Sequence, residues 1–389
     1  MILSVMDKRT PILIMFGGVS AEHEVSIITG LQVVEALDYD LYEPYVIYVR
    51  RNGVFCYLPR LTHRSQFLKV KALPCVLGVD DRGAYFKTER ILSKKIYVDV
   101  AYLAFHGGNG EGGAIQGMLE SLRIPFTSAD HEGSAIAMNK VLAKQVLKDK
   151  NISVVEGYQV FKADFLSNSD QLSSSLEGYL GYPMIIKPAH LGSSIGIQIA
   201  RDRDALFTHL SAALQMDNEI LIEKFMEGFV EYNVSVRVVD HHIICSEIER
   251  PRATDEILSF ADKYQREGSK KQQRNIGGMA NLARELPAKI SPTLAERIRD
   301  TARRVFVACR LGGVVRIDMM YVPASDQLFV NEINPIPGSM SFYLWEASGV
   351  PFRTQITESL EQALRDGEER QSFNLEYDTD VVEKFIQTA

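Results

Sequence analysis

Four polar residues stand two apart in two short segments toward the carboxyl end of the chain. The segments read Arg316-Ile-Asp318 and Glu332-Ile-Asn334, and mostly apolar residues flank both. Residues two apart on a strand point to the same face of a sheet. If the two strands are neighbours, Asp318, Glu332 and Asn334 converge as oxygen ligands suited to Mg²⁺. The alternative is a solvated sheet face, although polar groups within apolar strands favour the metal site.

A glycine- and serine-rich turn lies earlier in the chain. It reads His190-Leu-Gly-Ser-Ser-Ile-Gly196 and follows an apolar segment whose single charge is Lys187. Glycines let the backbone approach an anion, and hydroxyl and N–H groups can bind phosphate oxygens. An ordinary hairpin loop explains the turn alone equally well, and the spacing of a Walker A loop is absent. Combined with the carboxylates, and with Lys140, Lys187 and Arg316 as counter-charges, the turn fits phosphoryl transfer.

Alternating strands and helices are expected to position these groups. Apolar runs predict strands at 11–16, 45–49 and 98–105, and apolar spacing predicts a helix over 20–37. A strand, a glycine turn, a helix and another strand are typical of a doubly wound parallel sheet. Further along, we expect strands at 182–187, 219–223, 313–322 and 328–334, a hairpin over 234–246, helices over 138–147 and 294–309, and a mobile polar loop over 262–281.

Composition limits the classes of function. The 389 residues, 46% hydrophobic and 24% charged, suit two or three globular domains. A net charge of −7 provides no attraction for nucleic acid or an anionic membrane, so neither is expected as a partner. No apolar run is long enough to predict a membrane span. The four cysteines have no C-x-x-C spacing and suit a reducing compartment, so we expect a cytoplasmic protein.

An ordered series of motifs over residues 11–350 resembles the D-alanine–D-alanine ligases of the ATP-grasp superfamily. The series is GGVSAEHEVS at 17–26, HGGNGEGGAIQGMLE at 106–120, MNK at 138–140, IKPAHLGSSIG at 186–196, EKFMEG at 223–228, RID at 316–318 and NEINPIPG at 331–338. One motif alone could arise by chance, whereas the common order is specific.

The resemblance implies an α/β fold, with an N-terminal doubly wound parallel-sheet domain followed by a two-lobed α+β ATP-grasp fold. The implied division is a substrate-binding domain over 1–133, a central ATP-grasp lid lobe over 134–227, a metal-bearing catalytic lobe over 228–371 and a tail over 372–389.

The implied activity is an ATP-dependent ligase that makes D-alanyl-D-alanine for peptidoglycan synthesis. In this family the γ-phosphoryl group of ATP activates the carboxylate of a first D-alanine as an acylphosphate, and the amine of a second D-alanine attacks it. The implied cofactors are ATP and two Mg²⁺ ions, with Mn²⁺ as an alternative, and the implied assembly is a homodimer. The alternatives are a ligase of the same mechanism with another amino-acid or hydroxy-acid acceptor, and a nucleotide-binding sensor without catalysis.

Each candidate residue takes its role from the matching family position. The implied catalytic groups are Glu22, Ser193, Tyr264, Arg316 and the backbone N–H of Gly338, and the implied substrate-binding residues are Glu22, His106, Ser339 and Ser341. The implied ATP-binding residues are Lys140, Lys187, Ser193, Ser194, Glu223, Lys224, Glu231 and Lys263, and the implied metal ligands are Asp318, Glu332 and Asn334. Two of these have a simpler explanation, since an acid such as Glu22 suits a helix's first turn and His106 could be a turn histidine.

Several positions depart from the family pattern. Asn139 stands where an aspartate is usual, Leu191 replaces a common acid, and 228–231 carries one extra residue. The larger change is the segment 339–348, which is shorter than usual, lacks the family's proline and contains Trp345, the only tryptophan. Trp345 either packs at the start of a helix or contacts the substrate. Because the corresponding stretch shapes the second-substrate pocket, the acceptor stays open at this point.

Overall fold

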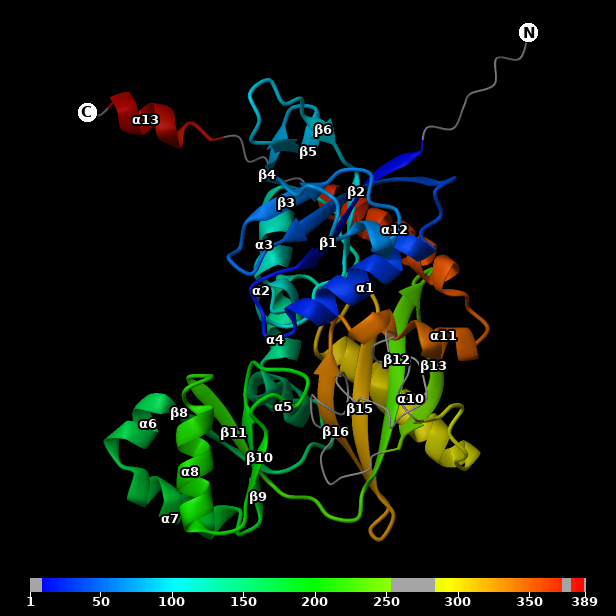
Figure 1. Cartoon of the computed structure of the whole chain (residues 1–389). Coiled ribbons are helices and arrows are strands. Elements are labelled where there is room, and N and C mark those ends of the chain that lie inside the picture. Colours follow the sequence, from blue (N-terminus) through cyan, green and yellow to red (C-terminus); the bar gives the residue numbers. More distant parts are fainter. Residues whose placement is uncertain (1–8, 253–283, 373–378, 388–389) are drawn as a thin grey trace.

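The computed structural model describes residues 9–252, 284–372 and 379–387. Within these ranges the chain forms three sheets with helices packed around them (Figure 1). One sheet belongs to the N-terminal part of the chain, one to the central part and one to the C-terminal part. The predicted loop over 262–281 lies outside the described residues.

The N-terminal sheet combines parallel and antiparallel strands, in the order β6-β5-β4-β3-β2-β1-β7. The parallel strands are β1 (Thr10–Gly17), β2 (Tyr42–Val49) and β7 (Val100–Leu103). The antiparallel strands are β3 (Phe55–Leu58), β4 (Leu73–Asp80), β5 (Gly83–Thr88) and β6 (Ile96–Tyr97). The parallel arrangement expected from the sequence is therefore confined to one end of the sheet. The other four strands pair antiparallel with their neighbours in sequence, through connections that range from the tight turn between β4 and β5 to the longer segment with η1 between β3 and β4, whereas parallel neighbours need crossovers.

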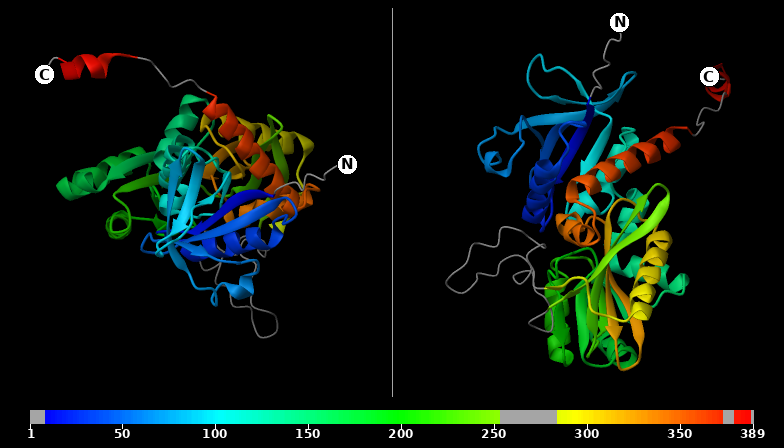
Figure 2. Two further views of the ribbon diagram at one scale, coloured as in Figure 1. Left: turned by 90° about the horizontal axis from the view of Figure 1, so that it is seen from above. Right: turned by 90° about the vertical axis from the view of Figure 1, so that its right-hand side faces the viewer.

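Helices from both ends of the chain pack on this sheet. Helix α1 (His23–Ala36) and helix α12 (Phe352–Gln371) both contribute to the hydrophobic core that contains β1 and β7. Helix α12 also contacts β12 of the C-terminal sheet, so it lies between the N-terminal sheet and the C-terminal sheet (Figure 2, right). Short helices α2 (Gly108–Glu111) and α3 (Ala114–Ser121) follow β7, and the turn η1 (Arg64–Gln66) follows β3. The domain division at 133, 227 and 371 stays a prediction, although α12 shares its core with the N-terminal strands.

The central sheet is antiparallel, in the order β10-β9-β11-β8. Its elements are β8 (Gly157–Phe161), α6 (Lys162–Ser167), α7 (Ser169–Tyr179), β9 (Met184–Pro188), β10 (Gln198–Ala200), α8 (Arg203–Ala213) and β11 (Glu219–Lys224). Apolar side chains of the strands pack against α7 and α8 in a separate core. The glycine- and serine-rich turn connects β9 to β10, and so it leaves the sheet at the end of the strand that carries Lys187.

The C-terminal sheet has the order β14-β13-β12-β15-β16, and its described strands pair antiparallel. Its elements are β12 (Val230–Val239), β13 (His242–Pro251), β14 (Arg284–Glu285), α10 (Pro292–Ala308), β15 (Val315–Val322) and β16 (Gln327–Asn334). In the β15–β16 pair Asp318 faces Glu332, and Arg316 faces Asn334. This register confirms the expected neighbouring strands, which place the polar groups of both strands together.

The chain then passes through η3 (Gly338–Ser341) and α11 (Phe342–Ala347) before α12. A last short helix, α13 (Val381–Gln387), projects from the body of the molecule (Figure 1). Among the described residues, no helix has the length and apolar character needed to cross a membrane.

The helix expected over 138–147 is present but begins at Lys140, because Met138 ends a separate helix that the sequence did not predict. Helix α4 (His131–Met138) ends before Asn139, and α5 (Lys140–Asp149) begins after it. The backbone of Asn139 is extended, and its side-chain Oδ1 accepts hydrogen bonds from the N–H groups of Val141 and Leu142 at 2.9 Å. Asparagine satisfies such otherwise unpaired N–H groups well, so a new helix begins at Lys140.

Candidate active site

A small pocket gathers polar groups from all three parts of the chain. It encloses about 40 Å³, and its lining includes Glu22, His106 and Glu111 from the N-terminal part and Ser193 from the central turn. The C-terminal part contributes Arg316, Glu332, Asn334 and Gly338, and Lys140 of α5 completes the set. The structure therefore brings together eight of the residues predicted from the sequence.

Glu22 and Ser193 touch although 171 residues separate them. Glu22 precedes α1 and is buried, and the Ser193 hydroxyl donates a hydrogen bond to its Oε1. Gly192 passes so close that a Cβ there would lie 2.6 Å from Glu22 Oε2. The backbone of the turn must approach a carboxylate at this point, which explains why glycine is used. The turn thereby closes over a buried negative charge.

Arg316 provides a buried positive charge in the lining of the same pocket. Its Nε and Nη2 donate to the two carboxylate oxygens of Asp318, each at 2.7 Å. Burial by itself lowers the pKa of the guanidinium, but Asp318 outweighs this and holds that pKa well above its ordinary value. A permanently charged donor beside the Gly338 segment suits the stabilisation of a developing oxyanion.

The donors on β15 and β16 fit a divalent cation. Asp318 and Glu332 face each other across the strand pair, and Asn334 Nδ2 donates to Asp318 Oδ2 at 3.1 Å. That bond turns the amide nitrogen of Asn334 to the carboxylate and leaves its Oδ1 for other contacts. Lys140 Nζ lies 3.0 Å from Glu332 Oε1 and offsets part of the negative charge. Two carboxylates and an amide oxygen are hard ligands, which match Mg²⁺.

A cleft of about 1050 Å³ opens between the central and C-terminal sheets and shares Lys140 and Glu332 with the small pocket. Its lining contains predicted nucleotide-binding residues Lys140, Lys187, Ser194, Glu223, Lys224 and Glu231, together with the metal-site residues Asp318 and Glu332. Apolar side chains such as Ile185, Phe225 and Met320 line it as well. Its size suits a nucleotide, and its lining combines charged groups, which suit phosphates, with apolar side chains, which suit a base.

Two lysines hold the buried carboxylate of Glu223. Lys187 Nζ lies 2.5 Å from Glu223 Oε2 and donates to Asn331 Oδ1 at 3.1 Å. Lys144 Nζ pairs with the other oxygen, Glu223 Oε1, and donates to the carbonyl of Val155 at 3.2 Å. Burial lowers the pKa of Lys187 to about 8 and that of Lys144 well below its ordinary value. Lys144 lies one helical turn after Lys140 on the buried face of α5 and is not among the residues predicted from the sequence.

We expect Lys144→Met to weaken nucleotide binding and the fold together. Removing one partner of a buried ion pair leaves Glu223 with a single cation, which costs about 3 kcal/mol. The free energy of unfolding should fall by that amount, and KM for ATP should rise about tenfold while KM for the amino acid changes little. Lys148→Met, an exposed position on the same helix, is the matched control. Unchanged stability and unchanged KM for ATP would contradict the assignment.

His106 connects the pocket to the segment after Gly338. Its Nε2 lies 2.7 Å from Thr29 Oγ1, and the same Thr29 oxygen accepts the Ser339 N–H at 3.1 Å. Burial lowers the pKa of His106 to about 4, so its imidazole is neutral. His106 thus contacts the pocket as an uncharged ring held by α1.

The altered segment after Gly338 packs into the core. Ser339 and Ser341 are buried with left-handed backbones and line neither pocket, so their predicted contact with substrate stays a prediction. Trp345 is 1% exposed, and its Nε1 donates to Ser235 Oγ at 2.9 Å. The guanidinium of Arg237 stacks on its ring at 4.4 Å. Of the two interpretations of Trp345, these contacts favour packing at a helix start.

Glu111 is a pocket residue that sequence analysis left without a role. Its carboxylate accepts the Gly107 N–H at 2.6 Å and the Ile336 N–H at 3.1 Å, so it joins the N-terminal part to the strand end near Asn334. Burial, reinforced by the nearby Glu22, raises the pKa of Glu111 to about 8. An acid within the glycine-rich motif at 106–120 was the available signal. Lys263 and Tyr264, also predicted, lie outside the described residues.

Two family descriptions and a series of curated relatives match most of the chain. Residues 11–129 match the family described as D-ala D-ala ligase N-terminus, and residues 146–361 match D-ala D-ala ligase C-terminus. The D-alanine–D-alanine ligase of Thermosipho melanesiensis is 35% identical over 350 residues, covering 89% of this chain and 91% of the relative. That of Chlorobium chlorochromatii is 33% identical, covering 92% and 98%.

Solved structures show the same fold. The D-alanine–D-alanine ligase of Coxiella burnetii has a TM-score of 0.77 at 24% identity, covering 93% of this chain and 96% of the other. The VanG D-Ala:D-Ser ligase of Enterococcus faecalis has a TM-score of 0.76 at 24% identity, covering 92% and 100%.

Proposed function

This chain belongs to the D-alanine–D-alanine ligase family, and we propose that the small pocket and the cleft together form its active site. The protein is an ATP-dependent ligase that joins two D-alanines, through an acylphosphate, into D-alanyl-D-alanine for peptidoglycan synthesis. It uses ATP and a divalent metal ion. One observation supports the site above all others: Glu22, Ser193, Arg316 and Gly338 converge on one pocket from distant parts of the chain.

The charges of the small pocket suit an amino acid held by both ends. We propose that Glu22 binds the ammonium group of the first D-alanine, since a buried carboxylate is its natural partner. The Ser193 hydroxyl fixes the Glu22 side chain, and His106 borders the same space. Arg316 and the Gly338 N–H stabilise the negative oxygen that develops when the second amine attacks. Closing the turn over Glu22 also keeps water from an activated carboxylate.

We propose that the cleft binds ATP and that the adjoining carboxylates hold two Mg²⁺ ions, with Mn²⁺ as an alternative. Lys140 and Lys187 line the cleft where they can contact phosphates, Ser194 borders it, and Glu223, Lys224 and Glu231 line it as candidates for binding the purine and ribose. Asp318, Glu332 and Asn334 supply the metal ligands. Bound metal ions would neutralise phosphate charge and orient the phosphoryl group.

Two further proposals concern the location and the assembly of the protein. We propose that it is cytoplasmic and that it forms a homodimer. The thiols of Cys56, Cys75, Cys245 and Cys309 are free, which suits a reducing compartment. Light scattering coupled to size-exclusion chromatography measures the mass: a dimer supports the assembly and a monomer refutes it.

A panel of acceptors tests the function. Purified protein is given Mg-ATP with D-alanine, with D-alanine plus D-serine, and with D-alanine plus D-lactate, and both phosphate and condensed product are measured. D-alanyl-D-alanine formed with stoichiometric phosphate supports the ligase. A mixed product in preference to the dipeptide would favour the alternative acceptor, and no phosphate release with any amino acid would refute the enzyme.

A further inference from the structure

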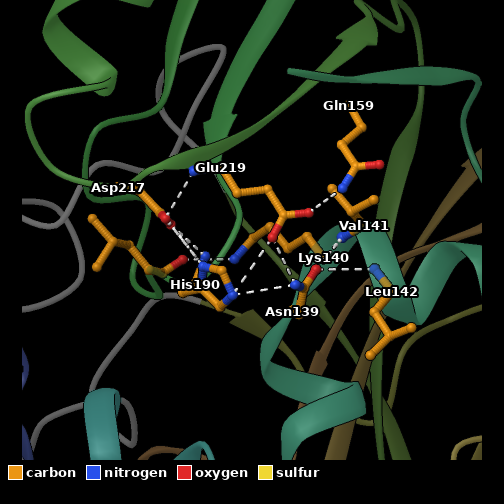
Figure 3. Close-up of polar contacts among 9 residues, drawn as sticks. Asn139, Lys140, Val141, Leu142, Gln159, His190, Asp217 and Glu219 are labelled. Carbon is orange, nitrogen blue, oxygen red and sulfur yellow. Dashed lines mark hydrogen bonds and ion pairs between the residues drawn. The ribbon is translucent and has the colours of Figure 1, made fainter. Parts of the chain in front are cut away.

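The turn that carries Ser193 and Ser194 begins inside a polar cluster that none of the roles above uses. The cluster comprises Asn139, Gln159, His190, Asp217 and Glu219, and we call it the His190 cluster (Figure 3). It lies on the central lobe, where β9 leads into the turn and where the loop before β11 passes α5. A histidine in this place can join the turn after β9, the segment leading into β11 and the start of α5. All three lead to residues that line the nucleotide cleft.

Asp217 holds His190 by two separate groups. The backbone N–H of His190 donates to Asp217 Oδ2 at 2.8 Å, and its ring Nδ1 lies 3.1 Å from each oxygen of the same carboxylate. One carboxylate thus fixes both the backbone and the side chain of the first residue of the turn. A carboxylate with several hydrogen-bond partners is a strong anchor.

The other side of the imidazole faces α5. His190 Nε2 lies 3.1 Å from Asn139 Nδ2 and 3.7 Å from Glu219 Oε2, and Asn139 Nδ2 also donates to that Glu219 oxygen at 2.9 Å. Asn139 Oδ1 is occupied by the cap of α5, so the amide cannot turn around. Asparagine at 139, where the family usually has aspartate, therefore supplies a neutral donor between a carboxylate and an imidazole.

The neighbours of His190 are tied to the same helix. The Lys140 N–H donates to the carbonyl of Ala189 at 3.0 Å, and Lys140 Nζ donates to the carbonyl of Leu191 at 2.6 Å. Residues 189–191 are thus fixed to Asn139 and Lys140, where α5 begins. Lys140 also reaches Glu332, so this helix end connects the turn to the proposed metal site.

We propose that His190 is a positioning residue, which fixes the glycine- and serine-rich turn to Asp217 and to the start of α5 so that Ser193, Ser194 and Lys140 reach the nucleotide as one unit. The inference rests on the proposed function, because it assigns the turn to nucleotide binding. His190 itself lines neither the small pocket nor the nucleotide cleft. Its effect passes through the backbone of 190–194.

The charges around His190 give this role a pH signature. Asp217 and Glu219 face the imidazole from the loop and β11, Lys140 faces it from α5, and Arg51 and Glu22 line the cleft of about 460 Å³ on its open side. The hydrogen bond that the imidazole donates to Asp217 and the charges of both acids raise the pKa of His190, whereas partial burial and Lys140 lower it. The Asn139 amide hydrogens that face Nε2 oppose the imidazolium, whereas Asp217 and Glu219 favour it. Because the pKa of His190 is raised, the anchored turn favours the imidazolium overall, and anchoring should weaken as pH rises through that pKa.

The first test measures the turn without any ligand. Hydrogen exchange of the 190–196 peptide should be faster in His190→Phe, which keeps a ring and loses both hydrogen bonds, than in the wild type. His190→Asn, whose amide can replace the Nδ1 donor, should restore most of the protection. His242→Asn, an exposed histidine on the β12–β13 turn, is the matched control and should leave exchange unchanged. Wild-type exchange in His190→Phe would overturn the proposal, whatever the activity of the protein.

The second test measures the dissociation constant of a non-hydrolysable Mg-ATP analogue against pH. In the wild type the constant should rise about threefold as His190 loses its proton, and His190→Asn should lack this step. Asn139→Asp adds a negative charge and should move the step to higher pH, whereas Asp217→Asn should move it to lower pH. Burial lowers the pKa of Lys187 to about 8 in every variant, so only the differences between variants carry the result.

Shifts in the same direction for Asn139→Asp and Asp217→Asn, or a step that persists in His190→Asn, would overturn the proposal. The two failures are separable: a protein that makes no dipeptide but shows the exchange effect refutes the ligase function and keeps the positioning role. A protein that makes dipeptide but shows no exchange effect supports the ligase function and refutes the positioning role.

Discussion

Glu332→Gln should lower the rate of D-alanine-dependent phosphate release by about three orders of magnitude. Glutamine keeps the size of the side chain and removes its negative charge, so the two facing carboxylates of the β15–β16 pair become one. A divalent cation bound there loses a hard anionic ligand. The ion pair of Glu332 with Lys140 is lost too, which leaves a lysine at the junction of both pockets without its counter-charge.

Phosphate release at saturating Mg-ATP and D-alanine measures this effect, and thermal denaturation checks the fold. Glu332 lies partly exposed at the pocket, so the melting temperature should change by only a few degrees. Glu368→Gln, an exposed position on α12, is the control for removing one glutamate charge. Wild-type turnover in Glu332→Gln would refute the metal assignment, and raised Mg²⁺ should recover part of the lost rate if affinity is the cause.

Glu22→Gln should lower kcat/KM for D-alanine by about two orders of magnitude, with KM for ATP changed less than about threefold. The reason is that a buried carboxylate binds an ammonium group far more strongly than a neutral amide does. The contact with Ser193 can persist through the amide oxygen, so the turn still closes over the pocket.

Glu24→Gln offers a close comparison for this change. Glu24 lies two residues away on α1, is largely exposed and pairs only loosely with Arg51 at 3.3 Å. Surface pairs of this kind contribute little, so its kinetic constants should match the wild type. Steady-state kinetics with each substrate varied in turn distinguish the cases. Equal losses for D-alanine and ATP in Glu22→Gln would argue that the residue supports the fold and does not bind the amino acid.

The strand pair of the proposed metal site was predictable because it depends on a local rule. Alternate residues of a strand share a face, and the observed register, which this rule does not fix, places Asp318 opposite Glu332. The contact between Glu22 and Ser193 is different. Nothing in the spacing of two residues so far apart indicates that they meet, and only the resemblance to a family suggested it. Whether these residues carry their assigned roles stays a prediction.

Other features could not be read from periodicity. Residues 51–97 form four short strands whose alternation is broken by turns, and a strand of two to eight residues gives little signal. Asn139 interrupts a helical pattern because its side chain caps the next turn, an effect that apolar spacing does not record. Lys144 lies on the buried face of α5, where a charge predicts nothing until its partner Glu223 is known.

The packing of α12 has a consequence for the folding of the protein during its synthesis on the ribosome. The strands β1, β2 and β7 leave the exit tunnel early, yet the core that covers them takes Ile356, Leu360 and Ala363 from a helix that is translated much later. The N-terminal sheet therefore stays apolar and incompletely covered until α12 has been synthesised, a period in which chaperones and premature association compete for it. Translation stopped before α12 would release a chain that contains most of the catalytic groups and lacks a closed core to hold them.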